Sequence, residues 1–249
     1  MRDPVQIIQI SDCHLFSNPA TTGPEGINPF QTLAAVLKKI QQLKPDMVLL
    51  TGDISGDDSE ESYQHFMQLW QQYCSGMSLV SIPGNHDVIS FWETHFSAQH
   101  RVQHVHIQDS PWYLHCLPSN FVGTRALISE DNVARVCDFI SAHSNQYHMV
   151  VLHHPVQEEG VWMDKHSLIN PDVLTPLYSL SALKIVLHGH VHTPRTVNRE
   201  HVKVLACPST CWQWGNTPEF SVAKEAPALR VIHLSDDGGW ETQIVSVQS

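Results

Sequence analysis

Five short stretches of the sequence carry residue types that act as acids, bases and metal ligands. They combine histidine with aspartate, asparagine and glycine, and they fall at residues 11–14, 51–53, 83–87, 153–155 and 188–192. Any one of them could occur by chance, because Asp-x-His or Gly-Asp is a short pattern. All five together, each directly after an apolar run, indicate one site built from several loops.

The donor atoms in these stretches favour a metal centre. Neutral imidazole is the commonest metal ligand, and the chain has 18 histidines. Carboxylate, amide oxygen and imidazole suit Mn²⁺, Fe and Zn²⁺, and the set is too rich in histidine for Ca²⁺ or Mg²⁺. The candidate ligands are too many for one tetrahedral ion but enough for two ions, about 3.5–4 Å apart, that share a carboxylate. Such a pair would lower the pKa of a bound water and hold a phosphoryl oxygen.

Strands must carry these stretches. Apolar, β-branched runs precede them at residues 5–10, 47–50, 79–82, 149–152 and 184–187. Further strands are predicted at residues 102–107, 112–117, 202–206, 228–234 and 240–247, with a hairpin turn at 236–239. Ligand sites in open α/β sheets lie beyond the carboxyl ends of the strands, so five such ends can converge on one crevice.

Helices are predicted between the strands from helical spacing of apolar residues. Asn28 before Pro29 and Ser59 before two glutamates read as N-caps. Further helices are expected after Ser129 and from Asn170 onward. Strands and helices alternate in the first two-thirds and strands follow alone, which indicates a mixed sheet, or two packed sheets, covered by helices.

Composition narrows the class of protein. No linker or low-complexity block divides the 249 residues, so a single domain over 1–249 is expected. A net charge of −11 argues against binding to nucleic acid. No run approaches the roughly 20 apolar residues of a membrane span, so no membrane partner is expected. No signal peptide is recognisable, which favours a cytoplasmic protein with reduced cysteines. Cys207 and Cys211 could form a metal pair but fit buried small residues better.

In content and order, the five stretches resemble the motifs of the calcineurin-like metallophosphoesterase superfamily. Those motifs read Asp-x-His, Gly-Asp, Gly-Asn-His-Asp/Glu, His-x-Pro and Gly-His-x-His, and here they span Asp12 to His192. The resemblance implies an α/β fold, a four-layer αββα sandwich of two mixed β-sheets flanked by helices.

The resemblance also implies a role for each residue. One ion would be held by Asp12, His14 and His192, the other by Asn85, His153 and His190, with Asp53 bridging both. His86 would bind no metal and would assist the leaving oxygen. The substrate phosphate would lie near His14, Asp53, Asn85, His86 and His192.

Two of these assignments required a choice between neighbouring histidines. The family ligand sits two residues before the proline, which selects His153 over His154. His188 precedes the glycine of the last motif and is left outside the ligand set.

Segments outside the motifs narrow the resemblance. Residues 8–16, 26–28, 162–170 and 208–213 are similar to bacterial class III 3′,5′-cyclic AMP phosphodiesterases. That similarity implies hydrolysis of a small-molecule phosphodiester, 3′,5′-cyclic AMP, to 5′-AMP by a metal-bound hydroxide. It implies two ions, with Fe or Mn favoured and Zn possible, in a monomer or homodimer. Residues 88–148 depart from the pattern of that group.

Other functions remain open at this point. Another phosphodiesterase or phosphomonoesterase of the superfamily would use the same ligands. Lipid hydrolases commonly carry Arg where His86 stands, and purple acid phosphatases carry a Tyr ligand that residues 54–57 lack. Non-catalytic scaffolds of the superfamily have typically lost ligands. Residues 157–170 would serve either as a cap over the substrate or as a packed surface loop.

Overall fold

The computed structural model describes residues 3–248, which form two β-sheets and the helices around them. The first sheet has the order β15-β14-β1-β2-β3. Its parallel strands are β1 (Val5–Ile10), β2 (Met47–Thr51) and β3 (Leu79–Ile82). The antiparallel strands β14 (Ala228–Leu234) and β15 (Trp240–Ser246) follow as a hairpin, as predicted.

The second sheet has the order β10-β11-β9-β8-β5-β4. The inner strands are parallel: β11 (Val202–Ala206), β9 (Leu183–His188), β8 (Tyr147–Val151) and β5 (Trp112–Cys116). The antiparallel edges are β10 (Arg195–Arg199) and β4 (Gln103–His106). Two small hairpins lie outside the sheets: β6 (Asn120–Val122) with β7 (Arg125–Leu127), and β12 (Gln213–Trp214) with β13 (Val222–Ala223).

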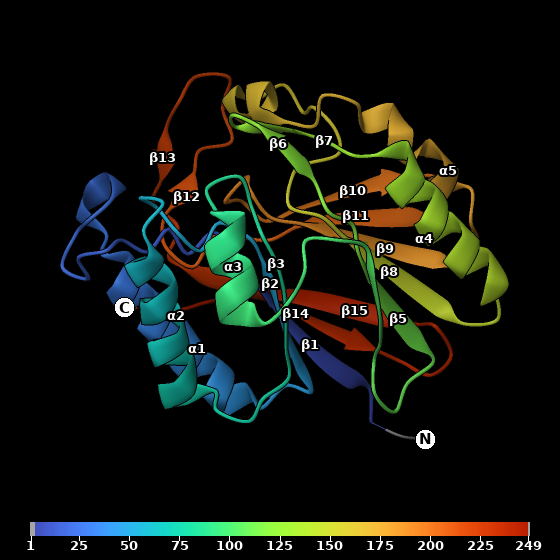
Figure 1. Cartoon of the computed structure of the whole chain (residues 1–249), viewed down its shortest axis with the longest axis horizontal. Helices are drawn as coiled ribbons and strands as arrows, with labels where there is room; N and C mark the ends of the chain where they lie inside the picture. Colours follow the sequence, from blue (N-terminus) through green and yellow to red (C-terminus); the bar gives the residue numbers. More distant parts are fainter. Residues whose placement is uncertain (1–2, 249) are drawn as a thin grey trace.

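Helices cover the outer faces of both sheets. The first group is α1 (Pro29–Leu43), α2 (Glu60–Tyr73) and α3 (Ile89–Phe96), and the second is α4 (Glu130–Ala142) with the short α5 (Thr175–Tyr178). The two groups lie on different sides of the molecule (Figure 1). Three 3₁₀ turns add η1 (Pro24–Gly26), η2 (Trp162–His166) and η3 (Pro171–Leu174). The fold is therefore the four-layer α/β sandwich of two mixed sheets that the resemblance implied.

Three apolar clusters correspond to the three interfaces of such a sandwich. Alternate residues of a strand point to opposite faces of its sheet. In β1, Ile8 and Ile10 pack under α1 and α2, whereas Ile7 packs in the cluster between the sheets. On the far side, the second sheet meets α4 and α5 in a cluster that includes Val150 and Val186. Because β1 is buried on both faces, its sequence is apolar except at the half-buried Gln6 and the buried Gln9.

Several elements were missed or mistaken in the sequence. The eight residues of α3, the two small hairpins and β10 were not predicted, because they are short or, as in β10, mostly exposed and polar. The helix expected from Asn170 is a 3₁₀ turn followed by a four-residue helix. Ser129 stands at the N-cap of α4 without a side-chain hydrogen bond, whereas Asn28 and Ser59 cap their helices as predicted.

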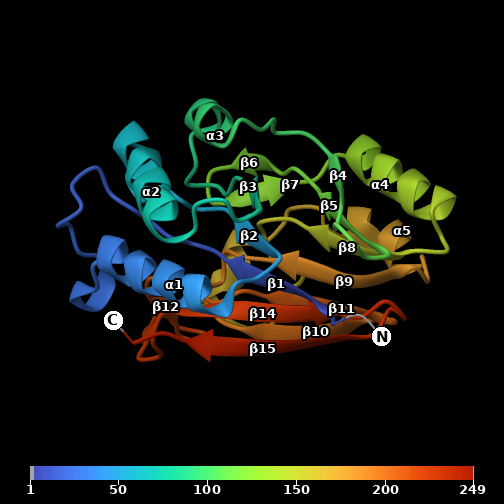
Figure 2. The ribbon, with the colours of Figure 1, turned by 90° about the horizontal axis from the view of Figure 1, so that it is seen from below.

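The edge strands β15 and β10 lie on the same side of the molecule (Figure 2). There the guanidinium of Arg230, on β14, donates to the carbonyl oxygen of Arg195 on β10 at 3.3 Å. Within residues 3–248, no helix has the length and apolar character that crossing a membrane requires.

A chain of histidines packs between the second sheet and α4. The distances are 2.8 Å from His104 Nδ1 to His115 Nδ1, 2.9 Å from His115 Nε2 to His148 Nδ1, and 3.0 Å from His148 Nε2 to the carbonyl oxygen of His143. A carbonyl only accepts, so His148 Nε2 carries a hydrogen. His115 Nε2 and His104 Nδ1 must then donate in turn, and one set of neutral tautomers satisfies all three bonds. Burial, with the neighbouring histidines, lowers the pKa of His115 to about 3.

The buried histidines make the stability of the fold depend on pH. Below an ordinary histidine pKa of about 6.5, His115 is protonated in the unfolded chain but stays neutral in the folded protein. The contribution of His115 to the free energy of unfolding is therefore present above that pH and is lost as the pH falls. From pH 7 to pH 5 the wild type should lose about 1–2 kcal/mol more unfolding free energy than His115→Gln, which keeps a donor and an acceptor but does not titrate. Urea unfolding at both pH values measures the difference. Equal losses in the two proteins would contradict this assignment.

Candidate metal centre

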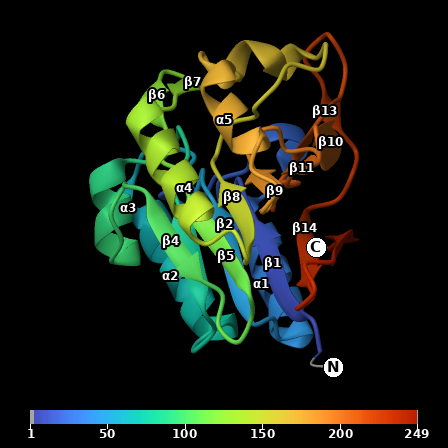
Figure 3. The same ribbon diagram turned by 90° about the vertical axis from the view of Figure 1, so that its right-hand side faces the viewer.

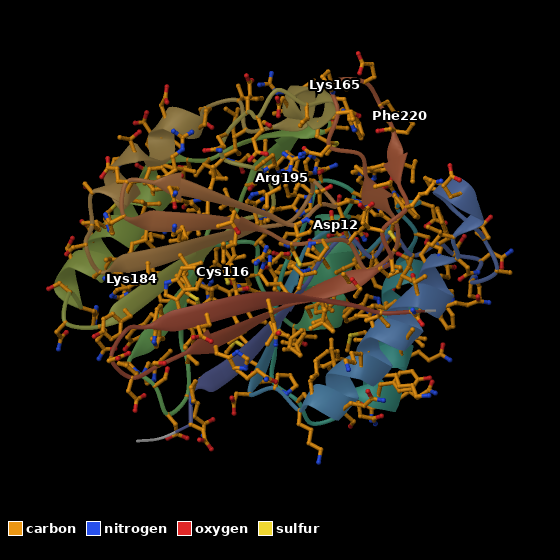
Figure 4. All side chains as sticks on the ribbon, turned by 180° about the vertical axis from the view of Figure 1, so that it is seen from behind. Asp12, Cys116, Lys165, Lys184, Arg195 and Phe220 are labelled. Carbon is orange, nitrogen blue, oxygen red and sulfur yellow. The ribbon has the colours of Figure 1, made fainter. Side chains whose placement is uncertain are left out.

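Each of the five predicted stretches follows a strand of the expected kind. Asp12 and His14 follow β1, Asp53 follows β2, and Asn85 and His86 follow β3, all in the first sheet. His153 follows β8, and His190 and His192 follow β9, both in the second sheet. Asp12 is fully buried and lies near the middle of the molecule as projected in Figure 4. The candidate ligands therefore come from the ends of strands in both sheets.

One group of donor atoms contains Asp12, His14 and His192. The Nε2 atoms of His14 and His192 are 3.0 Å apart, and His192 Nε2 is 3.5 Å from a carboxylate oxygen of Asp12. The Nδ1 atom of His192 lies 2.9 Å from the carbonyl oxygen of Trp212, to which it donates. That bond fixes the tautomer, so the Nε2 lone pair of His192 points into the group.

A second group contains Asp53, His153 and His190. His153 Nε2 is 3.3 Å from a carboxylate oxygen of Asp53 and 3.2 Å from His190 Nδ1. His153 Nδ1 lies 2.7 Å from the carbonyl oxygen of Thr51, which leaves Nε2 free to bind a metal. The same carboxylate oxygen of Asp53 is 3.9 Å from His14 Nε2 in the first group. Asp53 thus lies between the two groups, where a bridging ligand is expected.

The donor set fits two metal ions. Buried polar atoms are nearly always hydrogen-bonded, yet the buried Oδ1 of Asn85 has no partner among the described residues. Within each group, two imidazole nitrogens also lie close together, those of His14 and His192 and those of His153 and His190. A cation shared by the two nitrogens would satisfy their lone pairs. Each group brings its donor atoms within 4.8 Å of one another, close enough to hold one ion.

The electrostatics of the site depend on buried acids and imidazoles. Burial alone would raise the pKa values of Asp12 and Asp53, but nearby histidines outweigh it and hold both below the ordinary value. Burial likewise opposes charge on His153, but the Asp53 carboxylate raises its pKa to about 9. His153 must therefore lose a proton before its Nε2 can bind a metal.

The backbone at the ligands is strained. Asp12, His14, Asp53, His190 and His192 have φ values of 56°, 46°, 55°, 71° and 49°. This left-handed region is uncommon for residues other than glycine, and such strain concentrates at functional sites. Gly84 is needed for a different reason, since a Cβ there would collide with Asp53 and His153.

Asp87, to which the sequence analysis assigned no role, holds the loops that carry Asp53 and Asn85. Its buried carboxylate accepts five hydrogen bonds of 2.8–3.2 Å from the backbone NH groups of Asp53, Ile54, Ser55 and Gly84 and from the hydroxyl of Tyr63. The ends of β2 and β3 are thereby fixed relative to each other. Hydrogen bonds to backbone groups have no residue-type signature, which explains why this role was not predicted.

His86 stands at the mouth of the site. Its backbone NH donates to Asp53 at 2.9 Å, and its exposed ring meets the ring of His14 edge-on with centroids 5.1 Å apart. A pocket of about 120 Å³ opens here. Six candidate residues line it, namely His14, Asp53, Asn85, His86, His190 and His192, together with Thr124, Trp162, Met163, His166 and Trp214. The segment 157–170 therefore reaches the site through Trp162, Met163 and His166 and is not a remote surface loop. Thr124, in the divergent region, bonds to His166 at 2.6 Å.

The histidines and cysteines left outside the ligand set lie around it. His154 packs its ring on that of His190 at 4.4 Å and bonds to the carbonyl oxygen of Thr124. His188 bonds through Nδ1 to the carbonyl oxygen of Gly189. Cys207 and Cys211 are buried free thiols and belong to no metal-binding group within residues 3–248.

Comparison with known proteins identifies the family. The sequence pattern of the family described as calcineurin-like phosphoesterase matches residues 5–194. The chain belongs to this family and is a hydrolase of the phosphoesterase class.

The chain is similar over nearly its whole length to named cyclic-nucleotide phosphodiesterases. It is 28% identical to the 3′,5′-cyclic-nucleotide phosphodiesterase alr5338 of Nostoc sp., covering 98% of this chain and 93% of that protein. It is 30% identical to the 3′,5′-cyclic adenosine monophosphate phosphodiesterase CpdA of Escherichia coli, covering 96% of this chain and 89% of that protein.

Solved structures share the fold at low sequence identity. A dimetal phosphatase from Danio rerio superposes with a TM-score of 0.68 at 9% identity, covering 99% of this chain and all of that one. The purple acid phosphatase PPD1 of yellow lupin gives 0.70 at 11% identity, covering 99% of this chain and 52% of that one.

Replacing the Asp87 carboxylate should loosen the whole site. In Asp87→Asn an NH₂ group replaces one carboxylate oxygen, so a donor faces a donor and that hydrogen bond is lost. We therefore expect the free energy of unfolding to fall by about 2–3 kcal/mol. Chemical denaturation measures the loss, and the exposed Asp236→Asn serves as the matched control with a change within about 0.5 kcal/mol. Equal stability of the two variants would show that the loops do not depend on Asp87.

Proposed function

We propose that this protein is a metal-dependent phosphodiesterase that hydrolyses 3′,5′-cyclic AMP to 5′-AMP at a dinuclear site. The observation that supports this most is the pair of donor groups on either side of Asp53, with His86 beside them at the mouth of a pocket. The near full-length similarity to enzymes named as cyclic AMP phosphodiesterases supports the choice of substrate.

The ligands divide between two ions in the proposed site. Asp12, His14 and His192 would hold the first, and Asn85, His153 and His190 the second, with Asp53 shared. When bound, such a pair supplies positive charge for phosphoryl oxygens and a water of lowered pKa. Fe or Mn is the proposed pair, with Zn as the other ion suited to these ligands.

His86 is the proposed proton donor to the leaving oxygen. Its backbone is held by Asp53, while its ring is exposed to the pocket and makes no side-chain hydrogen bond among residues 3–248. The donor atoms of His86, His14 and Asp53 lie within 4.8 Å of one another, but the proposed ligand set leaves His86 out, so its ring is available to donate a proton as the bond to phosphorus breaks. In cyclic AMP the leaving oxygen is the 3′ oxygen, which gives 5′-AMP as the product.

Metal content separates a shared ligand from a ligand to one ion. Wild type should carry about two ions per chain. Asn85→Ala should lose one of them, because only the second ion uses Asn85, whereas Asp53→Asn should lose most of both. Elemental analysis of the purified variants measures this, with Asp236→Asn as the control. Equal retention of metal in both ligand variants would refute the assignment of Asp53 as the bridge.

Loss of the His86 ring should separate chemistry from metal binding. His86→Ala should keep its metal content and lower kcat about 10²–10⁴-fold, the usual contribution of a general acid. Steady-state kinetics with cyclic AMP measures kcat. His201→Ala, in the exposed turn between β10 and β11, is the control. A variant that lost metal but kept activity would exclude this role.

The substrate is tested by Mn²⁺-dependent hydrolysis of bis(p-nitrophenyl) phosphate, p-nitrophenyl phosphate and 3′,5′-cyclic AMP. The proposal requires diesterase activity and release of 5′-AMP, and the activity should disappear on chelation. Diesterase activity without cyclic AMP hydrolysis would favour another phosphodiester. No activity with any metal would overturn the proposal.

A further inference from the structure

Three aromatic side chains extend outward from the candidate metal centre. Trp162 lies on η2, Trp214 on β12, and Phe220 in the loop before β13. Their ring centroids are 5.4 Å apart for Trp162 and Trp214, 4.9 Å for Trp162 and Phe220, and 5.7 Å for Trp214 and Phe220. We call this group the aromatic rim. The 3₁₀ turn and the β12–β13 hairpin come together at one end of the molecule (Figures 1 and 3).

The aromatic rim begins on a candidate ligand and ends in solvent. The ring of Trp214 stacks on that of His192 with centroids 5.0 Å apart and an interplanar angle of 24°. Trp162 and Trp214 line the same pocket as Asn85 and His86. At the outer end, Phe220 is 63% exposed, the largest value among the large apolar side chains described. In Figure 4, Phe220 and Lys165 lie at the same edge of the molecule, further out than Asp12.

Hydrogen bonds hold the rim in place before any ligand binds. The backbone NH of Trp162 donates to the carbonyl oxygen of Thr217 at 3.0 Å, and its indole NH donates to that of Gly215 at 3.2 Å. The hydroxyl of Thr193 donates to the carbonyl oxygen of Trp214 at 2.8 Å. Segments distant in the sequence are thus joined around the pocket, so binding against the rim need not first order it.

The chemistry of the rim suits a flat ring. A single exposed aromatic residue is ordinary on a protein surface. Here Trp162 and Trp214 line the pocket and Phe220 packs against both of them beyond it, so the three present apolar faces and edges to whatever extends outward from the phosphate. Nucleobases stack on such side chains, and stacking tolerates any base because every base has a π-face. An aliphatic alcohol offers no comparable face.

We propose that the aromatic rim is the subsite that stacks the planar base of the substrate, so that the site prefers phosphodiesters of nucleosides over aliphatic ones. This inference rests on the proposed function for its substrate, but it concerns residues that neither the motifs nor the metal ligands include.

The test uses the product and its base-free counterpart as probes. Binding of 5′-AMP and of ribose 5-phosphate to the metal-loaded protein is measured by tryptophan fluorescence or equilibrium dialysis. Wild type should bind 5′-AMP about tenfold more tightly. Phe220→Ala should lose most of this preference with the affinity for ribose 5-phosphate unchanged, and Phe220→Tyr should keep it. The control Val122→Ala removes another exposed apolar side chain, 53% exposed on β6, and should change neither affinity.

Turnover gives a second measurement. In Phe220→Ala the KM for cyclic AMP should rise about five- to tenfold while kcat changes little, because the side chain meets the base and not the reacting phosphate. Equal binding of the two probes by wild type, or an undiminished preference in Phe220→Ala, would overturn the stacking subsite. A preference for 5′-AMP without any cyclic AMP hydrolysis would refute the proposed function and leave the subsite standing.

Discussion

The two sheets are joined, at the end where the five stretches meet, by hydrogen bonds of the candidate ligands themselves. The Asp12 carboxylate, after β1, accepts the backbone NH of His190, after β9, at 3.1 and 3.0 Å. A second bond runs the same way: Nδ1 of His153, after β8, donates to the carbonyl oxygen of Thr51 at the end of β2, at 2.7 Å. The apolar cluster between the sheets is non-directional and does not by itself fix how the strand ends face each other. The directional bonds do, together with the bond from the Gln9 side chain on β1 to the carbonyl oxygen of His188 on β9.

Bringing these groups together has an energetic cost that the rest of the fold must offset. Asp12, Asp53 and several imidazoles are buried at the same end, and five of the candidate ligands have left-handed backbone. Local rules are broken here in favour of a geometry useful for binding cations. The bonds to the Asp87 carboxylate and the three apolar clusters stabilise the fold and offset this cost. The outer faces of the sheets are packed mainly by apolar side chains. The exception is the chain of histidines under α4, whose hydrogen bonds require neutral rings at His115 and His148.

Local patterns in the sequence predicted the central strands and the ligand types, because an apolar run followed by histidine or aspartate is visible within a few residues. The choice of His153 over His154 came from the family resemblance, in which the ligand sits two residues before the proline. The structure turns His153 toward Asp53 and His154 toward Thr124. No local pattern in the sequence predicts which distant segments come into contact. For residues 157–170 the sequence left a cap and a surface loop as equal alternatives, and it gave no sign of the approach of Trp162 to Thr217, because tertiary packing alone decides both.

The inner and outer parts of the site are coupled through one ligand. His192 bonds to the carbonyl oxygen of Trp212, and its ring packs against those of His14 and Trp214. A change at Trp214 would therefore disturb metal and substrate together, and its effect could not be assigned to either. Phe220 touches the other two rings of the aromatic rim but is not in contact with a candidate ligand in the described structure. The exposed end of the rim is consequently the place where the proposed recognition of the base can be tested without altering the candidate metal centre.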